Sequence, residues 1–225
     1  MKRILASFTL LLALTASTVA ADAKPNVLFI GDSLMKEVGR SARRQIARLG
    51  GVAEVESSIG SGLARFDLYD WPAKLREKLG AKPSAVVVLL GANDEQDMDS
   101  PAGPVSYGTP AWSQMYGQRV DLLLAAAQES GTKLWWIGLP KMKDPKSDAH
   151  ATLVNGIVWA RIAARQDDKV AFIDISEIYA VDGKYASFIL IPPNNRVLEV
   201  RAEDGIHFNR AGADHLAQLI LGKIL

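Results

Sequence analysis

Short apolar runs alternate with longer amphipathic segments along the chain after residue 25. Five of the runs have the length and composition of β-strands. Three of these five are almost continuously apolar, as expected of parallel strands that are covered on both faces. The five predicted strands are NVLFIG (26–31), VAEVESSI (52–59), AVVVLLG (85–91), KLWWIGL (133–139) and VAFIDI (170–175).

The segments between these strands predict helices. In the first of them, apolar residues at spacings of three and four form one face, namely Met35, Val38, Ala42, Ile46 and Leu49. The predicted helices cover residues 35–49, 69–80, 111–130, 149–166 and 209–224. Strands and helices that alternate in this way predict right-handed crossovers. We therefore expect a three-layer α/β/α sandwich around a mostly parallel five-stranded sheet.

Two connections interrupt the alternation. Residues 94–110 are polar and contain several prolines and glycines, and residues 176–203 show no clear periodicity. Because long loops in a compact domain are usually functional or disordered, both are candidate walls of a binding site. The sequence contains no internal repeat and no linker, so residues 25–225 are predicted to form a single domain.

A serine stands where the first predicted strand stops, in the sequence Gly31-Asp32-Ser33. Open parallel sheets bind ligands beyond the carboxyl ends of their strands, and the helix that follows begins with free backbone N–H groups. Ser33 is therefore a candidate nucleophile beside an anion-stabilising dipole. A serine before a helix is also a favoured N-cap, and this alternative stays open here.

A nucleophilic serine needs a general base, because its hydroxyl is a poor nucleophile at its own pKa. The chain has three histidines. We expect His150 at an exposed helix start and His215 half exposed in the last helix. His207 differs because Asp204 precedes it by three residues in EDGIHFN. A carboxylate on one imidazole nitrogen leaves the other nitrogen free to accept the serine proton.

Two further strand ends carry candidate donors to an oxyanion. Asn93 follows the strand at 85–91, and its side-chain amide is a hydrogen-bond donor, although asparagine is also a common turn residue. Gly60 and Gly62 follow the second strand, where a backbone N–H without a neighbouring side chain approaches a substrate closely.

Four blocks of residues occur in order along the chain, namely Gly31-Asp32-Ser33-Leu34, a glycine after the second strand, Gly91-Ala92-Asn93-Asp94, and Asp204-Gly205-Ile206-His207. In these blocks the chain resembles the SGNH, or GDSL, hydrolase superfamily, over nearly its whole length after residue 25. The run GSGLARFDLYDWPAKL further resembles an exported bacterial subgroup that is catalogued as a domain of unknown function.

This resemblance implies a flavodoxin-like fold and the hydrolysis of acyl esters, O-acetyl esters foremost, without a metal or another cofactor. Ser33 would be the nucleophile and, through its backbone N–H, an oxyanion donor. His207 would act as base and then as acid, and Asp204 would orient its ring.

The resemblance also implies that Asn93 and a glycine N–H complete the oxyanion hole. The glycine block departs from the superfamily's pattern, because Gly60 and Gly62 flank Ser61 and no asparagine precedes them. Ser61-Gly62 is more similar to the usual dipeptide, so Gly62 is favoured and Gly60 stays open.

Other patterns have simpler interpretations. Ser33 and Lys36 form S-x-x-K, but the accompanying motifs of penicillin-binding enzymes are absent, so we expect Lys36 to face solvent. The acidic segment DEQDMD (94–99) lacks the glycine and the distal glutamate of a calcium loop, so it is interpreted as a solvated loop. The basic segment PKMKDPK (140–146) is predicted to be a solvated loop, and contact with an anionic polymer is the alternative.

Composition excludes several classes of protein. The chain has 26 Lys and Arg against 25 Asp and Glu, a formal net charge of +1 and no cysteine. It has no basic run typical of nucleic-acid binding, and the lack of cysteine excludes disulfides and thiol catalysis. Because the chain has no cysteine and only three histidines, a structural zinc site is not expected.

The first residues predict a secretory signal at 1–21, with cleavage within 20–23. Lys2 and Arg3 form a basic start, and an apolar stretch too short to span a bilayer precedes small residues suited to cleavage. Cleavage would change the formal charge to −1. We therefore expect a periplasmic or secreted protein without stable membrane insertion after cleavage.

The sequence as a whole predicts an exported serine esterase whose substrate is a small acyl ester or an acylated glycan. Two alternatives stay open, namely an O-acyltransferase with the same acyl-enzyme chemistry and a non-catalytic glycan-binding envelope protein. Seven aromatic residues are expected near the site, namely Tyr69, Trp71, Tyr107, Trp112, Tyr116, Tyr185 and Phe188. They either stack on sugars or pack helix starts against the core. The oligomeric state is not predicted.

Overall fold

Five parallel strands form the central sheet in the order β2-β1-β3-β4-β5. The strands are β1 (Asn26–Gly31), β2 (Val52–Ser57), β3 (Ala85–Leu89), β4 (Lys133–Ile137) and β5 (Val170–Ile173). The computed structural model describes residues 24–225, so the predicted signal peptide lies outside the described residues. The predicted α/β fold is confirmed, and every strand pair of the sheet is parallel.

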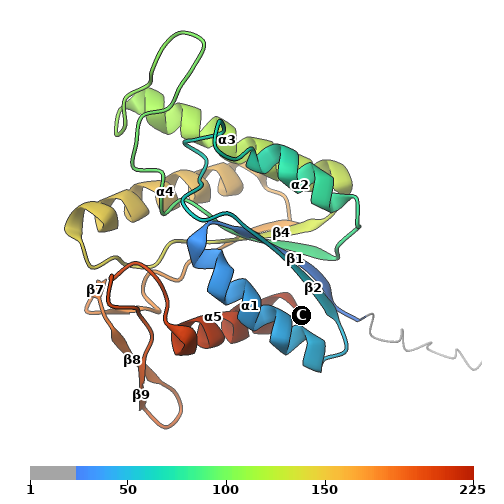
Figure 1. The fold of residues 1–225 in the computed structure, drawn as a ribbon, viewed down its shortest axis with the longest axis vertical. Coiled ribbons are helices and arrows are strands. Elements are labelled where there is room, and N and C mark those ends of the chain that lie inside the picture. Colours follow the sequence, from blue (N-terminus) through green and yellow to red (C-terminus); the bar gives the residue numbers. More distant parts are fainter. Residues whose placement is uncertain (1–23) are drawn as a thin grey trace, which may run out of the picture.

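Five helices cover the two faces of the sheet (Figure 1). They are α1 (Ser33–Arg48), α2 (Trp71–Leu79), α3 (Pro110–Ser130), α4 (Pro145–Arg165) and α5 (Arg210–Ile224). Helices α1 and α5 pack together on one face, and α2, α3 and α4 form the layer on the other. None of the helices within residues 24–225 combines the length and apolarity needed to cross a membrane.

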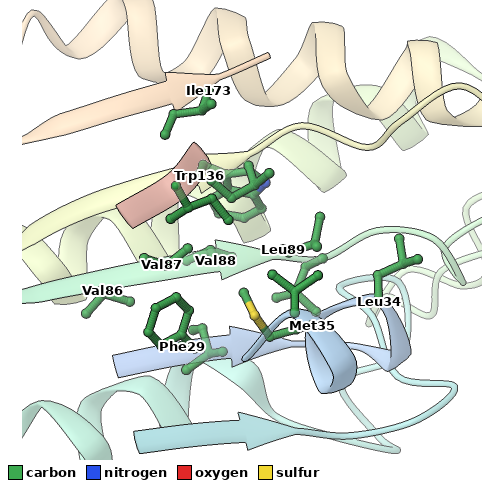
Figure 2. Packing of buried hydrophobic residues seen from close by; sticks show 14 of the residues in the cluster. Phe29, Leu34, Met35, Val86, Val87, Val88, Leu89, Trp136 and Ile173 are labelled. Atoms are coloured by element: carbon green, nitrogen blue, oxygen red, sulfur yellow. The ribbon is translucent and has the colours of Figure 1, made fainter. Parts of the chain in front are cut away.

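The central strands are buried on both faces, which explains their unbroken apolar sequences. All five residues of β3 are buried, and Val86, Val87 and Val88 are fully inaccessible to solvent. Figure 2 shows these side chains in one cluster with Phe29 of β1 and Trp136 of β4. Burying a large apolar side chain contributes about 1.5–3 kcal/mol, so this layer is a major source of the stability of the fold.

The strand order reverses beside β1. The chain leaves β1 for β2 on one side and returns to β3 on the other, and ligands bind open α/β sheets at such a point. Gly31 is paired with Ser57 of β2 and with Leu89 of β3, so these three strands end at one level. The loops that follow them therefore share one rim.

The prediction that residues 176–203 lack regular structure is wrong. This stretch contains two antiparallel hairpins, β6 (Ala180–Val181) with β7 (Lys184–Tyr185) and β8 (Phe188–Ile191) with β9 (Arg196–Glu199). The first hairpin turns through Asp182-Gly183, both with positive φ, which is the turn that Asp-Gly favours between short strands. The second projects beside α5 (Figure 1).

Candidate active site

Ser33 is the first residue of α1, directly beyond β1. The helix is capped by Asp32, whose Oδ1 accepts a hydrogen bond from the Leu34 N–H at 2.9 Å, so the interpretation of Ser33 as the N-cap is wrong. A Cβ on Gly31 would lie 2.0 Å from the Leu89 carbonyl oxygen, so the chain can pass this point only with glycine. The hydroxyl of Ser33 is thus left free for another partner.

That partner is His207. Its Nε2 lies 2.8 Å from Ser33 Oγ, and its Nδ1 lies 2.7 Å from Oδ2 of Asp204. Because a carboxylate only accepts, Nδ1 carries the ring proton, and Nε2 accepts the hydroxyl proton of Ser33. The structure therefore brings together the three residues predicted from the sequence, Ser33, His207 and Asp204. The side chains of His207 and Asp204 are 38% and 48% exposed, so the site is open to solvent.

Asp204 is held in its ionised form. Partial burial alone would raise its pKa, but the backbone N–H groups of His207 and Ile206 and the His207 ring lower the pKa to about 2. The two N–H groups donate to Oδ1 at 2.9 and 2.8 Å, which leaves Oδ2 for the imidazole. The carboxylate is thus pre-oriented, and it stabilises an imidazolium whenever one forms.

A buried arginine that sequence reasoning missed supports this loop. Arg201 is 2% exposed, and its guanidinium donates to the carbonyl oxygens of Lys141 at 2.9 Å and of Ile206 at 2.8 Å. It also lies over the rings of Phe208 and Tyr185, with centroids 5.1 and 5.2 Å away. No local pattern distinguishes such an arginine from an exposed one, because its partners are backbone carbonyls, which every residue has, and that of Lys141 lies 60 positions away.

Asn93 lies on the same rim and holds the loop after β2. Its side-chain Nδ2 donates to the carbonyl oxygen of Ser61 at 2.9 Å, and the second hydrogen of the amide is free to point elsewhere. Since C=O and N–H point in opposite directions across a trans peptide, the N–H of Gly62 is directed away from the Asn93 amide.

The two candidate glycines have different surroundings. Gly60 is exposed with φ +74°, and nothing lies within 4 Å of a Cβ built on it. Gly62 is buried, and a Cβ there would lie 2.0 Å from Oδ1 of Asp94. The need for glycine at 62 is therefore explained by the close carboxylate of Asp94, whereas Gly60 presents bare backbone at the rim.

Two fully buried carboxylates join the rim loops from beneath. Oδ2 of Asp32 accepts the N–H groups of Gly91 and Ala92, each at 3.1 Å, and ties the start of α1 to the end of β3. Burial raises the pKa of Asp32 to about 7, although the three backbone N–H donors act in the opposite direction.

Asp94 ties the loop after β2 to β3 in the same manner. Its carboxylate accepts the N–H groups of Leu63 and Ala64, at 2.9 and 2.8 Å, and the Tyr116 hydroxyl at 2.9 Å. Burial raises its pKa as well. The sequence interpretation of 94–99 as a solvated acidic loop is therefore wrong at its first residue.

The other two histidines lie elsewhere. The expectation of an exposed His150 is wrong, because its side chain is buried, with Nε2 2.8 Å from the Gly91 carbonyl oxygen and Nδ1 3.0 Å from the Tyr107 hydroxyl. His150 thus braces the turn that carries Asn93. His215 is half buried in α5, as expected, and its Nδ1 lies 3.0 Å from the Tyr179 hydroxyl.

Three of the seven aromatic residues are not available for stacking on sugars. Trp71, Trp112 and Tyr116 are fully buried and pack helix starts against the core, which decides between the two interpretations for these three. Tyr69, Tyr107 and Tyr185 are partly buried. Phe188 on β8 is 53% exposed. Within residues 24–225 no group of three or more His, Asp or Glu side chains is arranged to hold a metal ion.

Comparisons with known proteins agree with this architecture. The family model described as "Protein of unknown function (DUF459)" matches residues 26–223. No curated protein matches the chain.

Solved structures with the same fold include a lipase/acylhydrolase from Enterococcus faecalis, with 20% identity, a TM-score of 0.57 and coverage of 89% of this chain and 95% of that one. A carbohydrate esterase family 3 protein from Talaromyces cellulolyticus gives 15% identity, a TM-score of 0.60 and coverage of 89% and 96%. An acetyl-xylooligosaccharide esterase from Geobacillus gives 17% identity, a TM-score of 0.58 and coverage of 89% of this chain and 94% of that one. At these identities the likeness is one of fold.

Proposed function

Since the chain belongs to the DUF459 family and has the fold of GDSL-like lipases and acylhydrolases, we propose that it is a serine esterase of the SGNH type. The observation that carries the proposal is the continuous hydrogen-bonded array from Ser33 Oγ through His207 to Asp204. A hydroxyl, an imidazole in the required tautomer and an ionised carboxylate are the parts that acyl-enzyme chemistry needs.

In the first half of the reaction, Ser33 Oγ attacks the carbonyl carbon of the ester while His207 Nε2 takes the hydroxyl proton. The imidazolium that forms is stabilised by Asp204. It then gives the proton to the leaving alkoxide oxygen, the ester C–O bond breaks, and an acyl-Ser33 remains. In the second half, His207 draws a proton from water, the hydroxide attacks the acyl carbon, and the carboxylic acid leaves as Ser33 regains its proton.

The negative charge on the carbonyl oxygen requires donors at the rim. We assign this role to the backbone N–H of Ser33 at the start of α1, the free amide hydrogen of Asn93 and the N–H of Gly60. Gly60 is preferred to Gly62, because the Gly62 N–H is directed away from the Asn93 amide. Each such donor is worth about 10²–10³ in rate in a comparable enzyme.

The substrate we propose is an O-acetyl ester on a glycan. Two of the similar structures are named as esterases that act on carbohydrates, and the open site suits an ester on a polymer better than a buried acyl chain. Export of the protein belongs to the same proposal and rests on the sequence of residues 1–21.

The test is acetate release by the purified protein from acetylated xylo-oligosaccharides and from p-nitrophenyl acetate, with Ser33→Ala as the matched control. We expect turnover by the native protein, loss of turnover in the variant, and labelling of Ser33 by a serine-directed organophosphate. Turnover by Ser33→Ala at the rate of the native protein would refute the assignment of Ser33 as the nucleophile. Acetyl transfer to added sugars, in place of acetate release, would assign the O-acyltransferase activity instead.

A further inference from the structure

A groove lined by arginines runs along α1 and α5 toward the β8–β9 hairpin. It consists of two adjoining hollows with volumes of about 260 and 810 Å³, and both are lined by Arg44 of α1 and Arg210 of α5. The smaller one also includes Arg40, and the larger one includes Arg48 of α1 and Arg196 of β9. We call these five arginines and the two hollows the arginine groove.

The positive charge of the arginine groove is only partly neutralised. Glu37 and Asp214 are the acidic residues that line it, and they pair with Arg40 at 2.6 Å and with Arg44 at 2.7 Å. Asp214 is further engaged by the Ser41 hydroxyl.

The ion pairs among residues 24–225 include none of the other three arginines of the groove. Against a formal charge of +1 for the whole chain, this leaves a local positive excess in one concave surface. Scattered exposed arginines on a convex surface are simply solvated. Here three separate elements direct them into one hollow, which suits an anionic ligand.

The arginine groove leads away from the candidate active site. Ser33, Glu37, Arg40 and Arg44 recur at three- and four-residue spacings and so share one face of α1. With a rise of 1.5 Å per residue, Arg44 lies about 16 Å along the helix from Ser33. On α5, Arg210 follows His207 by only three residues. A chain-like ligand with one unit at Ser33 would therefore continue into the groove.

We propose that the arginine groove binds the acidic groups of an anionic polysaccharide whose ester-bearing sugar lies at Ser33. Guanidinium groups bind carboxylates in a bidentate manner, so repeating uronic acid units match a row of arginines. The larger hollow is also lined by Ile191 and Leu198, which offer apolar contact to the C–H faces of sugars. The position of the ester at Ser33 rests on the proposed esterase function. The binding of the glycan in the arginine groove does not depend on that function.

The binding test uses the Ser33→Ala protein and needs no turnover. Titration calorimetry with unacetylated oligogalacturonate should show binding that a combined Arg48→Gln and Arg196→Gln change weakens about tenfold or more. The matched control carries Arg43→Gln and Arg76→Gln. Both of these arginines are exposed and line neither hollow, so the control removes the same charge and should bind like the parent.

Neutral xylo-oligosaccharide, inorganic phosphate and a phosphate-bearing oligosaccharide are titrated in parallel. Absence of oligogalacturonate binding, or equal weakening by the control pair, would overturn the inference. Equal binding of the neutral oligosaccharide would also overturn it. Binding of the phosphate-bearing chain alone would refute the assignment to carboxylates.

The turnover test compares acetylated oligogalacturonate with acetylated xylo-oligosaccharide. The ratio of their kcat/KM values should fall about tenfold in the Arg48→Gln/Arg196→Gln protein and stay constant in the control pair. An unchanged ratio in both would contradict the inference. Binding of oligogalacturonate by a protein that cleaves no ester at all would leave the groove assignment supported and would refute the esterase function instead.

Discussion

The Nε2 atom of His207 lies 2.8 Å from Oγ of Ser33 although 174 positions separate the two residues. Ser33 stands at the carboxyl end of a central strand, and His207 precedes the helix that packs against α1, so the packing of α5 on α1 brings them together (Figure 1). The hydrogen-bonded array of Ser33, His207 and Asp204 is already formed without a substrate. We therefore expect the chemistry to need little rearrangement of the site.

Ser33→Ala and His207→Ala should each lower kcat by about 10⁴-fold or more, because each removes a group needed in both half-reactions. The double variant should be scarcely slower than either single one, since the two residues act as a unit. Steady-state kinetics with p-nitrophenyl acetate measures this. If the two losses in kcat multiplied in the double variant, Ser33 and His207 would not act as a unit.

Asn93→Ala should lower kcat by about 10²–10³-fold with little change in KM, because its amide is assigned to the charge that develops in the transition state. The change also removes the hydrogen bond to the Ser61 carbonyl oxygen, so the loop has to be checked separately. Thermal unfolding of the variant provides that check. A kcat within threefold of the native value would remove Asn93 from the oxyanion hole.

Arg201→Met should loosen the loop that carries His207, because two backbone carbonyl oxygens lose their donors. The loss of these partly buried hydrogen bonds costs about 1–3 kcal/mol of folding free energy. We expect kcat to fall about tenfold at temperatures where the variant is fully folded, with partial recovery in Arg201→Lys.

A purely structural role for Arg201 would lower the unfolding temperature alone. The proton NMR signal of the His207 Nδ1–H bonded to Asp204 separates the two cases. It should broaden in Arg201→Met if the arginine positions the ring, and an unaltered signal together with native kcat would refute this role.

Asp32 makes stability depend on pH. Its pKa is about 7 in the folded protein against an ordinary value of 3.8, so between these values the folded state holds a proton that the unfolded chain has lost. The contribution of Asp32 to the free energy of unfolding is therefore fully present below pH 4. It falls as the pH rises to 7, by up to about 1.4 kcal/mol per pH unit.

Asp32→Asn should remove this part of the pH dependence. Urea unfolding of both proteins at pH values from 4 to 8 measures it, and the stability of the native protein should decline more steeply than that of the variant. Parallel curves for the two proteins would show that the Asp32 carboxyl does not titrate in this range.

Gly62→Ala should destabilise the protein by about 1–3 kcal/mol, because the new Cβ would meet the Asp94 carboxylate at 2.0 Å. Gly60→Ala has free space around the new methyl group and bears only the strain of its positive φ, about 1 kcal/mol. Urea unfolding compares the two. A larger loss in Gly60→Ala would contradict the packing described for the loop after β2.

The layers of the fold could be predicted from the sequence because buried parallel strands need unbroken apolar runs, and the run at 85–91 is short and rich in valine, which favours a strand over a helix. The meeting of Ser33 with His207 could be anticipated because the ends of parallel strands share one edge. The environment of His150 could not, since its partners are the Gly91 carbonyl and the Tyr107 hydroxyl, far away in the chain.

The buried positions of Asp32 and Asp94 could not be predicted for a related reason. A carboxylate that accepts backbone N–H groups in the core has the same sequence signature as one in water. The Asp182-Gly183 turn, by contrast, has a recognisable sequence signature. Its hairpin could not be predicted because each strand has only two residues, too few to show an alternating pattern.

The docking of α5 on α1 also has a consequence in time. A nascent chain that contains β1 and α1 already carries the hydroxyl of Ser33. This hydroxyl has no proton acceptor until His207 has been synthesised and α5 has packed on α1. Ester cleavage would begin only at that moment. The onset of turnover during translation would then report the last step of folding.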